Sequence, residues 1–243
     1  MLKIALIGFG TVGESVARIL CDGTHEQLSL EMICNRDVER KVVDWVPRSV
    51  VWTSDIGDVL RSDVDVVVEL IGGIEPATEW IRKSLEAGKS VVTGNKQVIA
   101  NSGASLIEIA DRHGGHLLFE AAVAGGIPIV RGVQEGLAGD KLIRVCGLLN
   151  GTCNFILTRM EDDNISFGDA LGEAQALGFA ESDPTADVDG SDAQAKLAIL
   201  SRVGLCSAIE AQAIPCRSIR PVEPVDFTYA HRLGCTIRQV SRV

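Results

Sequence analysis

The chain has 243 residues, of which 46% are hydrophobic, and its formal net charge is −10. This length can bury one large core or two modest ones, and we favour two domains. The acidic balance, with no cluster of Lys and Arg, argues against nucleic-acid binding. No segment has the roughly 18 consecutive apolar residues of a membrane span. Gly8 and Gly10 interrupt the apolar run at the N-terminus, which argues against a cleavable signal.

Short apolar runs alternate with helical patterns through the first half of the sequence. Strands are predicted at LKIALIG, LSLEMIC, DVVVELIG, KSVVTG and GHLLFEAAV, and helices over 11–21, 76–87 and 102–112. Strands that are apolar almost throughout indicate a parallel sheet covered by helices on both faces. The predicted fold class is therefore α/β, with a doubly wound parallel sheet over residues 1–126.

The pattern changes at the segment GGIP, residues 125–128. Helices are expected over 127–137, 153–160, 166–177 and 192–203, with a strand at KLIRVCGLLN before the second of them. A Pro-containing stretch, a last helix and a strand-like end, CTIRQVSRV, complete the sequence. This mixture predicts an α+β domain over residues 127–243, and a ligand cleft is expected between the two domains.

The motif Gly8-Phe9-Gly10-Thr11-Val12-Gly13 follows the first predicted strand and opens the first predicted helix. Gly8 permits the tight turn, Gly10 lets the backbone approach a pyrophosphate, and Gly13 lets the helix pack against the sheet. Free N–H groups at the helix start would bind the phosphates. The alternative is a merely tight strand-to-helix turn, but the context favours a Rossmann-type dinucleotide site.

The residues after the second predicted strand bear on the choice between NADP and NAD. An acidic residue there would hold a ribose 2′-hydroxyl, whereas this chain has Asn35 and Arg36, and Arg36 suits a 2′-phosphate. Arg36 could equally be an exposed loop cation. Glu31 or Asp37 could supply the acidic group if the strand boundary is wrong by two residues. We favour NADP.

Thr93-Gly94-Asn95-Lys96 follows another predicted strand and so lies at the carboxyl edge of the sheet, where ligands of doubly wound folds bind. Lys96 can contact a cofactor or an oxyanion there. In the alternative interpretation Asn95 caps a helix and Lys96 is solvated. We favour the functional interpretation.

Asp192 and Lys196 are four residues apart on a predicted helix and share one face. That face continues through apolar residues, so partial burial should couple the two titrations and make the proton affinity of the lysine tunable. The pair is either an acid/base pair or a buried structural salt bridge. Glu181 precedes it in an acidic loop that could bind a cationic group or a metal. We interpret the outer aspartates of this loop as solvated turn residues, namely Asp183, Asp187 and Asp189.

Seven scattered cysteines, without a CxxC pair or zinc spacing, are typical of reduced thiols, so we expect a cytoplasmic protein. Cys153 lies between these motifs and is either a nucleophile or a small buried residue. No His is near it in sequence, which favours burial.

Taken together, GFGTVG, TGNK, GLLNGTCNFILTRM and GFAESDPTADVDGSDAQAKLAIL resemble the homoserine dehydrogenase family, in order over essentially the whole chain. The resemblance implies interconversion of L-homoserine and L-aspartate 4-semialdehyde by hydride exchange with NAD(P). This is an oxidoreductase step of threonine, methionine and isoleucine biosynthesis.

The resemblance also implies roles for individual residues. Lys196 would donate and accept the proton of the substrate oxygen, with Asp192 binding substrate beside it. Glu181 would hold homoserine, Lys96 would contact the cofactor near the reacting centre, and Gly178 would approach the cofactor. The family's sodium site, built largely from main-chain carbonyls, maps to Glu120, Val123, Gly125 and Ile127.

The family pattern continues beyond the last residues of this sequence. The second domain is therefore expected to be incomplete at its C-terminus, and a homodimer is expected if the interface survives the shortening. The alternative function is a catalytically silent nucleotide-binding or interaction protein, a truncated copy that kept the fold. Intact Lys96, Glu181, Asp192 and Lys196 favour the enzyme.

Overall fold

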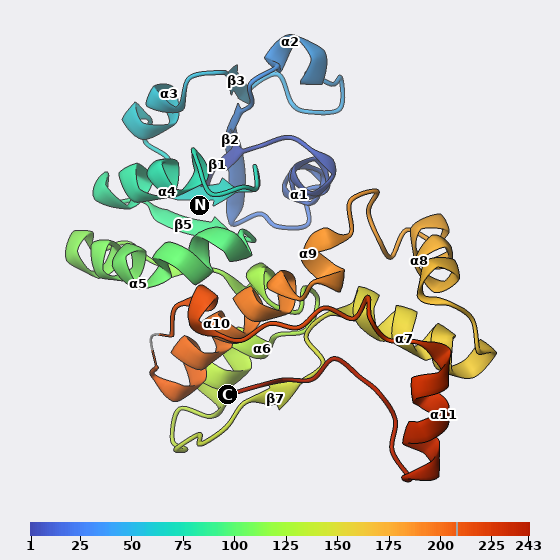
Figure 1. Ribbon diagram of the computed structural model, residues 1–243. Helices are drawn as coiled ribbons and strands as arrows, with labels where there is room; N and C mark the ends of the chain where they lie inside the picture. The colour runs from blue at the N-terminus through green and yellow to red at the C-terminus, as the bar shows by residue number, and fades with distance from the viewer. Residues whose placement is uncertain (208) are drawn as a thin grey trace. The chain divides into compact units, whose positions relative to one another are not determined.

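The computed structural model describes residues 1–207 and 209–243, which form two compact units, 1–131 and 132–243 (Figure 1). The sequence placed the boundary five residues earlier. The carboxylate of Glu120 explains the difference, because it accepts hydrogen bonds from the N–H groups of Val130 (3.0 Å) and Arg131 (2.8 Å). These bonds hold the short helix α6 (Ile129–Arg131) against the first unit.

The first unit is built on one parallel sheet of six strands in the order β3-β2-β1-β4-β5-β6. The strands are β1 (Leu2–Ile7), β2 (Leu28–Cys34), β3 (Val51–Thr53), β4 (Val66–Glu69), β5 (Ser90–Thr93) and β6 (Leu117–Leu118). The chain runs outward from β1 in one direction and then from β4 in the other. The carboxyl ends of all six strands therefore share one edge, and the predicted doubly wound α/β fold is confirmed.

Helices cover both faces of this sheet, as right-handed crossovers require. They are α1 (Thr11–Cys21), α2 (Val38–Lys41), α3 (Ile56–Arg61), α4 (Ala77–Glu86) and α5 (Lys96–His113). Figure 1 shows α3, α4 and α5 on one side of the sheet and α1 on the other. The core beneath α1 includes Leu6, Ala17 and Ile33.

Some predicted elements of this unit were wrong in extent. Helix α5 begins six residues before the predicted start, because the Asn95 side chain accepts a hydrogen bond from the Val98 N–H and caps the helix there. The predicted strand GHLLFEAAV pairs only at Leu117–Leu118 and then forms a 3₁₀ turn, η1 (Glu120–Ala122). The short elements α2, β3 and α3 carry too little periodicity to be recognised, and they were missed.

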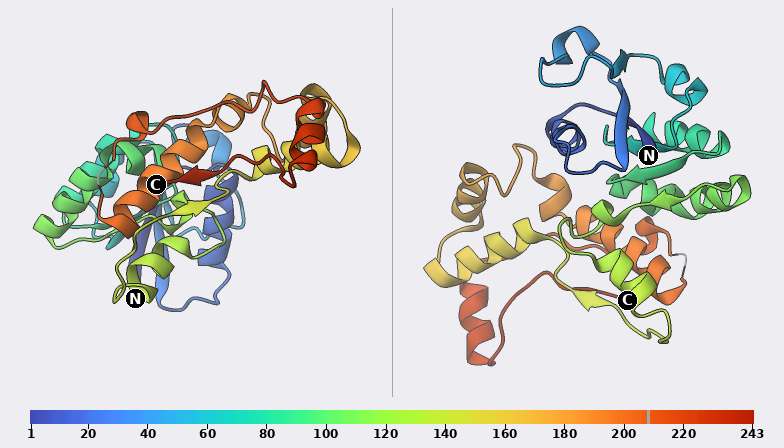
Figure 2. Two further views of the ribbon diagram at one scale, coloured as in Figure 1. Left: turned by 60° about the horizontal axis from the view of Figure 1, so that its bottom comes forward. Right: turned by 180° about the vertical axis from the view of Figure 1, so that it is seen from behind.

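The second unit is mainly helical. Its elements are η2 (Gly132–Gly136, a π-helix), β7 (Cys146–Gly147), α7 (Gly151–Asp163), α8 (Phe167–Ala176), α9 (Thr185–Val188), α10 (Ser191–Leu205), η3 (Ala211–Ala213), α11 (Pro224–Arg232) and β8 (Ser241–Arg242). Strands β7 and β8 pair antiparallel. The core includes Ile156, Leu157 and Met160 of α7 and Ala170 and Ala174 of α8. Figure 2 shows α11 beside α7.

The predicted helix over 127–137 and the predicted strands KLIRVCGLLN and CTIRQVSRV were too long. The first becomes α6 followed by the irregular π-helix η2, whose sequence GVQEG has a glycine at each end. Only two residues of each predicted strand belong to a ladder, extended by reciprocal backbone bonds between Val145 and Val243. A two-stranded ribbon alone gives little support to a longer strand.

Two further findings concern the chain as a whole. None of the described helices is long and apolar enough to cross a membrane. All seven cysteines are free thiols, of which Cys34 in the first unit and Cys153 in the second are buried.

Glu161 of α7 binds the last turn of α11 and the segment that follows it. Its Oε1 accepts hydrogen bonds from Thr236 and His231, each at 2.6 Å, and its Oε2 lies 2.6 Å from the Arg238 guanidinium. The hydrogen bond from Thr236 is the largest of the effects that lower the pKa of Glu161 from 4.5 to about 2. The charged form of this carboxyl is thus the one that the fold stabilises.

We expect the stabilisation by Glu161 to be fully present above about pH 4.5 and to be lost as the pH falls towards 2. Glu161→Gln should be less stable than the wild type at neutral pH, and the difference should shrink on acidification. Urea unfolding of both proteins over a pH series, followed by circular dichroism, measures this difference. A difference that does not change with pH would contradict the prediction.

Candidate functional site

Three glycines shape the turn between β1 and α1, each for a different reason. Gly8 has φ +98°, and a Cβ there would lie 2.9 Å from the Leu70 carbonyl oxygen. A Cβ on Gly13 would lie 2.1 Å from the carbonyl oxygen of Gly8, so only glycine lets α1 pack this closely. A Cβ on Gly10 would meet nothing within 4 Å. The space that Gly10 leaves at the start of α1 is where a pyrophosphate would approach.

The N-terminus of α1 suits an anion. Gly10 is its N-cap and provides no side-chain cap, and Thr11 and Val12 are exposed. The N–H groups of a first helical turn lack intrahelical acceptors and attract phosphate. Phe9, by contrast, is buried, and its N–H donates to Asn35 Oδ1 at 3.2 Å. The motif thus fits a dinucleotide through its glycines and helix start, whereas Phe9 anchors the turn to the end of β2.

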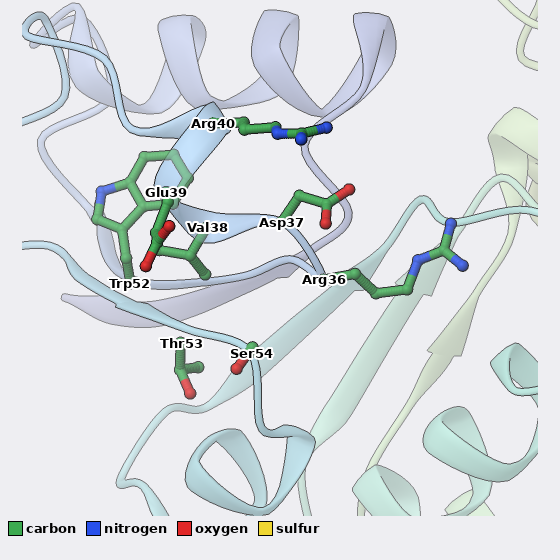
Figure 3. Close-up of a pocket in the computed structure, with 8 residues that line it drawn as sticks. All are labelled: Arg36, Asp37, Val38, Glu39, Arg40, Trp52, Thr53 and Ser54. Carbon is green, nitrogen blue, oxygen red and sulfur yellow. The ribbon is translucent and has the colours of Figure 1, made fainter.

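Arg36 lies just beyond the carboxyl end of β2, beside an open hollow of about 720 Å³. In Figure 3 the side chains of Arg36, Asp37 and Arg40 extend to one side of this hollow and Trp52 lies on the other. Strand β2 ends at Cys34 as predicted, so the boundary shift on which the alternative roles of Glu31 and Asp37 depended does not occur. The Glu31 carboxylate lies inside β2 and accepts a hydrogen bond from Ser29. Arg36 and Asp37 are the charged groups next to the strand end.

A buried carboxylate organises the neighbouring part of the same sheet edge. Glu69, at the end of β4, is fully buried and accepts hydrogen bonds from the Ile71 N–H (2.8 Å) and the Thr93 hydroxyl (2.6 Å). The Thr93 oxygen in turn accepts from the Asn95 N–H at 2.9 Å. These bonds fix the start of α5, where Lys96 is the first helical residue and is half-buried. Capping by Asn95 and a functional Lys96 are therefore compatible.

Asp192 and Lys196 form an ion pair on α10, with 2.6 Å between Asp192 Oδ2 and Lys196 Nζ. The Asp192 side chain is 2% exposed and that of Lys196 18%. Lys196 Nζ also donates to the Leu149 carbonyl oxygen at 3.0 Å. A buried carboxylate beside the ammonium of a partly exposed lysine side chain is suited to proton exchange with a bound hydroxyl group.

Asn150 connects this pair to the rest of the second unit. Its Nδ2 donates to Asp192 Oδ2 at 2.9 Å and to Asp187 Oδ1 at 2.6 Å. Its Oδ1 accepts from the Cys153 N–H at 2.8 Å and caps α7. The sequence analysis quoted this residue within GLLNGTCNF without assigning it a role. An Asn before a helical pattern predicts a cap, but nothing local indicates the two carboxylates.

The acidic loop before α10 differs in part from its interpretation as solvated turns. Asp183 accepts from the Thr185 N–H, as expected for a turn. Asp187 binds Asn150, and Asp189 accepts from Ser218 (2.7 Å) and Arg220 (2.9 Å), so both make contacts beyond the turn. These partners lie about 30 positions or more away in the sequence, so local turn chemistry could not reveal them. The Asp189 side chain is nevertheless 42% exposed, as expected for a solvated residue.

Glu181 and Gly178 lie on the exposed loop between α8 and α9. Gly178 has φ +78°, with open space where a Cβ would be. Within the described ranges no hydrogen bond or ion pair joins the Glu181 carboxylate to the Asp192–Lys196 pair. Nor do those ranges contain a group of three or more His, Cys, Asp or Glu residues that could hold a metal ion.

Cys153 is fully buried, and its thiol donates to the Asp187 carbonyl oxygen at 3.1 Å. Burial raises the pKa of this thiol to about 12. A thiol that stays protonated is a poor nucleophile, so the interpretation of Cys153 as a small buried residue is confirmed.

The segment mapped to a sodium site is an irregular loop. Ala124 and Gly126 both have positive φ, which turns successive peptide groups in different directions. The carbonyl oxygens of Glu120 and Ile127 each accept one backbone hydrogen bond, from Val123 and Ile129. A carbonyl oxygen has a second lone pair, so these two oxygens can still coordinate a cation.

Comparisons with known proteins identify both halves of the chain. Residues 8–120 match the family "Homoserine dehydrogenase, NAD binding domain" and residues 128–243 match the family "Homoserine dehydrogenase". The homoserine dehydrogenase of Synechocystis sp. is 42% identical over 243 residues, which are 98% of this chain and 56% of that protein. The chain thus spans about half the length of the curated relatives it matches.

Two solved structures cover the whole chain. A presumed homoserine dehydrogenase from Archaeoglobus fulgidus superposes with a TM-score of 0.86 at 32% identity, over 100% of this chain and 80% of that one. A hyperthermophilic archaeal homoserine dehydrogenase in complex with NADPH gives a TM-score of 0.81 at 27% identity, over 100% and 78%. With the two family matches, these likenesses establish that the chain belongs to the homoserine dehydrogenase family.

Proposed function

We propose that this chain interconverts L-homoserine and L-aspartate 4-semialdehyde by hydride exchange with NAD(P). The Asp192–Lys196 pair carries the proposal, because it places a buried carboxylate 2.6 Å from the ammonium of a lysine whose side chain is partly exposed. A purely structural pair does not need a partly exposed lysine. Family membership supports the substrate, and the glycine turn before α1 supports the dinucleotide.

Lys196 performs the proton transfer in this proposal. In the oxidising direction the hydroxyl proton of homoserine passes to the neutral Lys196 amine as the carbon–oxygen double bond forms, and Asp192 stabilises the resulting ammonium. A dinucleotide held at the glycine turn before α1 would supply the hydride acceptor for the same carbon, so the alcohol would lose one hydride and one proton. In the reducing direction the ammonium returns the proton to the carbonyl oxygen. Glu181 binds the substrate ammonium group.

The cofactor would be held by the first unit. Gly8, Gly10 and Gly13 would cradle the pyrophosphate at the start of α1, and Lys96 would contact the dinucleotide at the same sheet edge. Gly178 is a further proposed contact of the cofactor. NADP is favoured over NAD because the guanidinium of Arg36 follows β2, where an exposed cation can bind a 2′-phosphate. The NADPH-bound archaeal relative is consistent with this choice.

Three further features of the proposal rest on the family resemblance or the composition. A sodium ion would bind the main-chain carbonyls of Glu120, Val123, Gly125 and Ile127, which suit a hard cation. A homodimer is the proposed assembly. The cytoplasmic location stays a prediction from the scattered thiols.

Lys196→Ala should lower kcat by about 10²- to 10⁴-fold, because a positioned proton acceptor is lost, and should leave dinucleotide affinity nearly unchanged. The assay records reduced nicotinamide in the presence of L-homoserine and NADP or NAD at alkaline pH. Lys141→Ala, which removes an exposed lysine of the same unit, is the control. Near wild-type turnover in Lys196→Ala would refute the assignment. A wild-type chain that binds dinucleotide without turnover would instead be a silent binder.

Arg36→Ala should weaken NADP binding by about 10- to 100-fold, the effect of losing a charged hydrogen bond, and change NAD binding by no more than about twofold. Titration calorimetry with each dinucleotide measures both affinities. Arg48→Ala, which removes another exposed arginine of the first unit, controls for the loss of positive charge. Equal losses for both dinucleotides, or none for NADP, would make Arg36 an ordinary loop cation.

A further inference from the structure

Asn150 is a neutral amide buried among charged groups. It is 4% exposed, and it is the N-cap of α7. Its two Nδ2 hydrogens point to carboxylates on two other elements, Asp187 on α9 and Asp192 on α10. One side chain therefore joins three helices at the candidate proton-transfer pair.

The orientation of this amide follows from its neighbours. Its oxygen faces the Cys153 N–H, which only donates, and its nitrogen faces two carboxylates, which accept. A flipped amide would place oxygen against both carboxylates and nitrogen against an N–H group. The observed orientation is the one in which all three contacts are hydrogen bonds.

The amide also separates like charges. Asp187 and Asp192 both approach Nδ2, so their carboxylates lie near each other with a single donor group between them. Lys196 faces Asp192 from the same helix, and the Cys153 thiol is directed at the Asp187 main chain from α7. Without the amide, the negative charge of both carboxylates would draw the Lys196 ammonium, which would then be directed at Asp187 as well as at Asp192.

We propose that Asn150 is a positioning residue that holds Asp192 in place, so that Lys196 is directed at the substrate oxygen rather than at Asp187. This inference rests on the proposed function of the Asp192–Lys196 pair. It assigns Asn150 two separable tasks, because Oδ1 caps α7 while Nδ2 orients the carboxylates. Substitutions can remove the second task and keep the first.

Asn150→Asp is the decisive variant. An Asp caps a helix about as well as Asn does, so α7 should keep its start. The donor is replaced by a third carboxylate, which favours the protonated form of Lys196. In the pH dependence of kcat for homoserine oxidation, we expect the rise on the acid side to shift to higher pH by about one unit. We also expect kcat at neutral pH to fall about 10- to 100-fold. Dinucleotide affinity should not change.

A second readout does not depend on turnover. Acetylation of Lys196 by acetic anhydride over a pH series, quantified by mass spectrometry with exposed Lys141 as the internal reference, reports the fraction of neutral amine. In Asn150→Asp the pH at which acetylation of Lys196 is half-maximal should rise by about one unit, while the corresponding pH for Lys141 stays constant. This shift would support the positioning role even if the chain proved catalytically silent, in which case only the proposed function would fail.

Asn150→Ser and Ser166→Ala separate positioning from stability. Serine keeps a capping oxygen but is too short to reach both carboxylates, so kcat should fall without loss of dinucleotide affinity. Ser166 caps α8 in the same unit, away from the pair, and its removal should lower stability but not kcat in folded protein. Wild-type kcat in Asn150→Ser, or an unshifted pH of half-maximal Lys196 acetylation in Asn150→Asp, would overturn the proposal.

Discussion

The second unit depends on the pairing of one buried carboxylate. Asp192 is nearly inaccessible, and burying an unpaired carboxylate is strongly unfavourable. Lys196 provides the opposite charge and Asn150 a hydrogen bond, so the start of α7 must meet the first turns of α10 at one point. Because the same amide reaches Asp187, α9 is held there as well. The hydrogen bonds and ion pair around Asp192 therefore favour the same arrangement of α7, α9 and α10 as the apolar core around α7 does.

In the first unit, close backbone contact rather than an ion pair fixes the glycine turn between β1 and α1. The close contact of Gly13 with the Gly8 carbonyl fixes the angle at which α1 leaves the sheet. Along the same edge, the hydrogen bonds of Glu69 tie the turn after β4 to the start of α5. The glycine turn and the start of α5, which carries Lys96, are thus both held in place by contacts with neighbouring strand ends.

The sequence predicted well what is local. The glycine motif, the strands beside it and α1 follow from periodicity, and the Asp192–Lys196 contact follows from a spacing of four on a helix. Contacts between residues far apart in the sequence were not predicted, because no sequence pattern links Asn150 to a carboxylate 42 positions away. Glu69 was missed for the same reason: within an apolar run it looks like an exception, and only the folded sheet supplies Thr93 as its partner.

The two buried thiols allow the opening of each unit to be measured by chemical labelling. Cys34 ends β2 beside the candidate cofactor turn, and Cys153 follows the cap of α7 beside the proton-transfer pair. Burial raises the pKa of Cys34 to about 11 and of Cys153 to about 12, so both thiols are protected from alkylating reagents while their units stay folded. The rate at which each becomes labelled therefore measures the opening of its own unit, and one peptide map can follow the two halves independently.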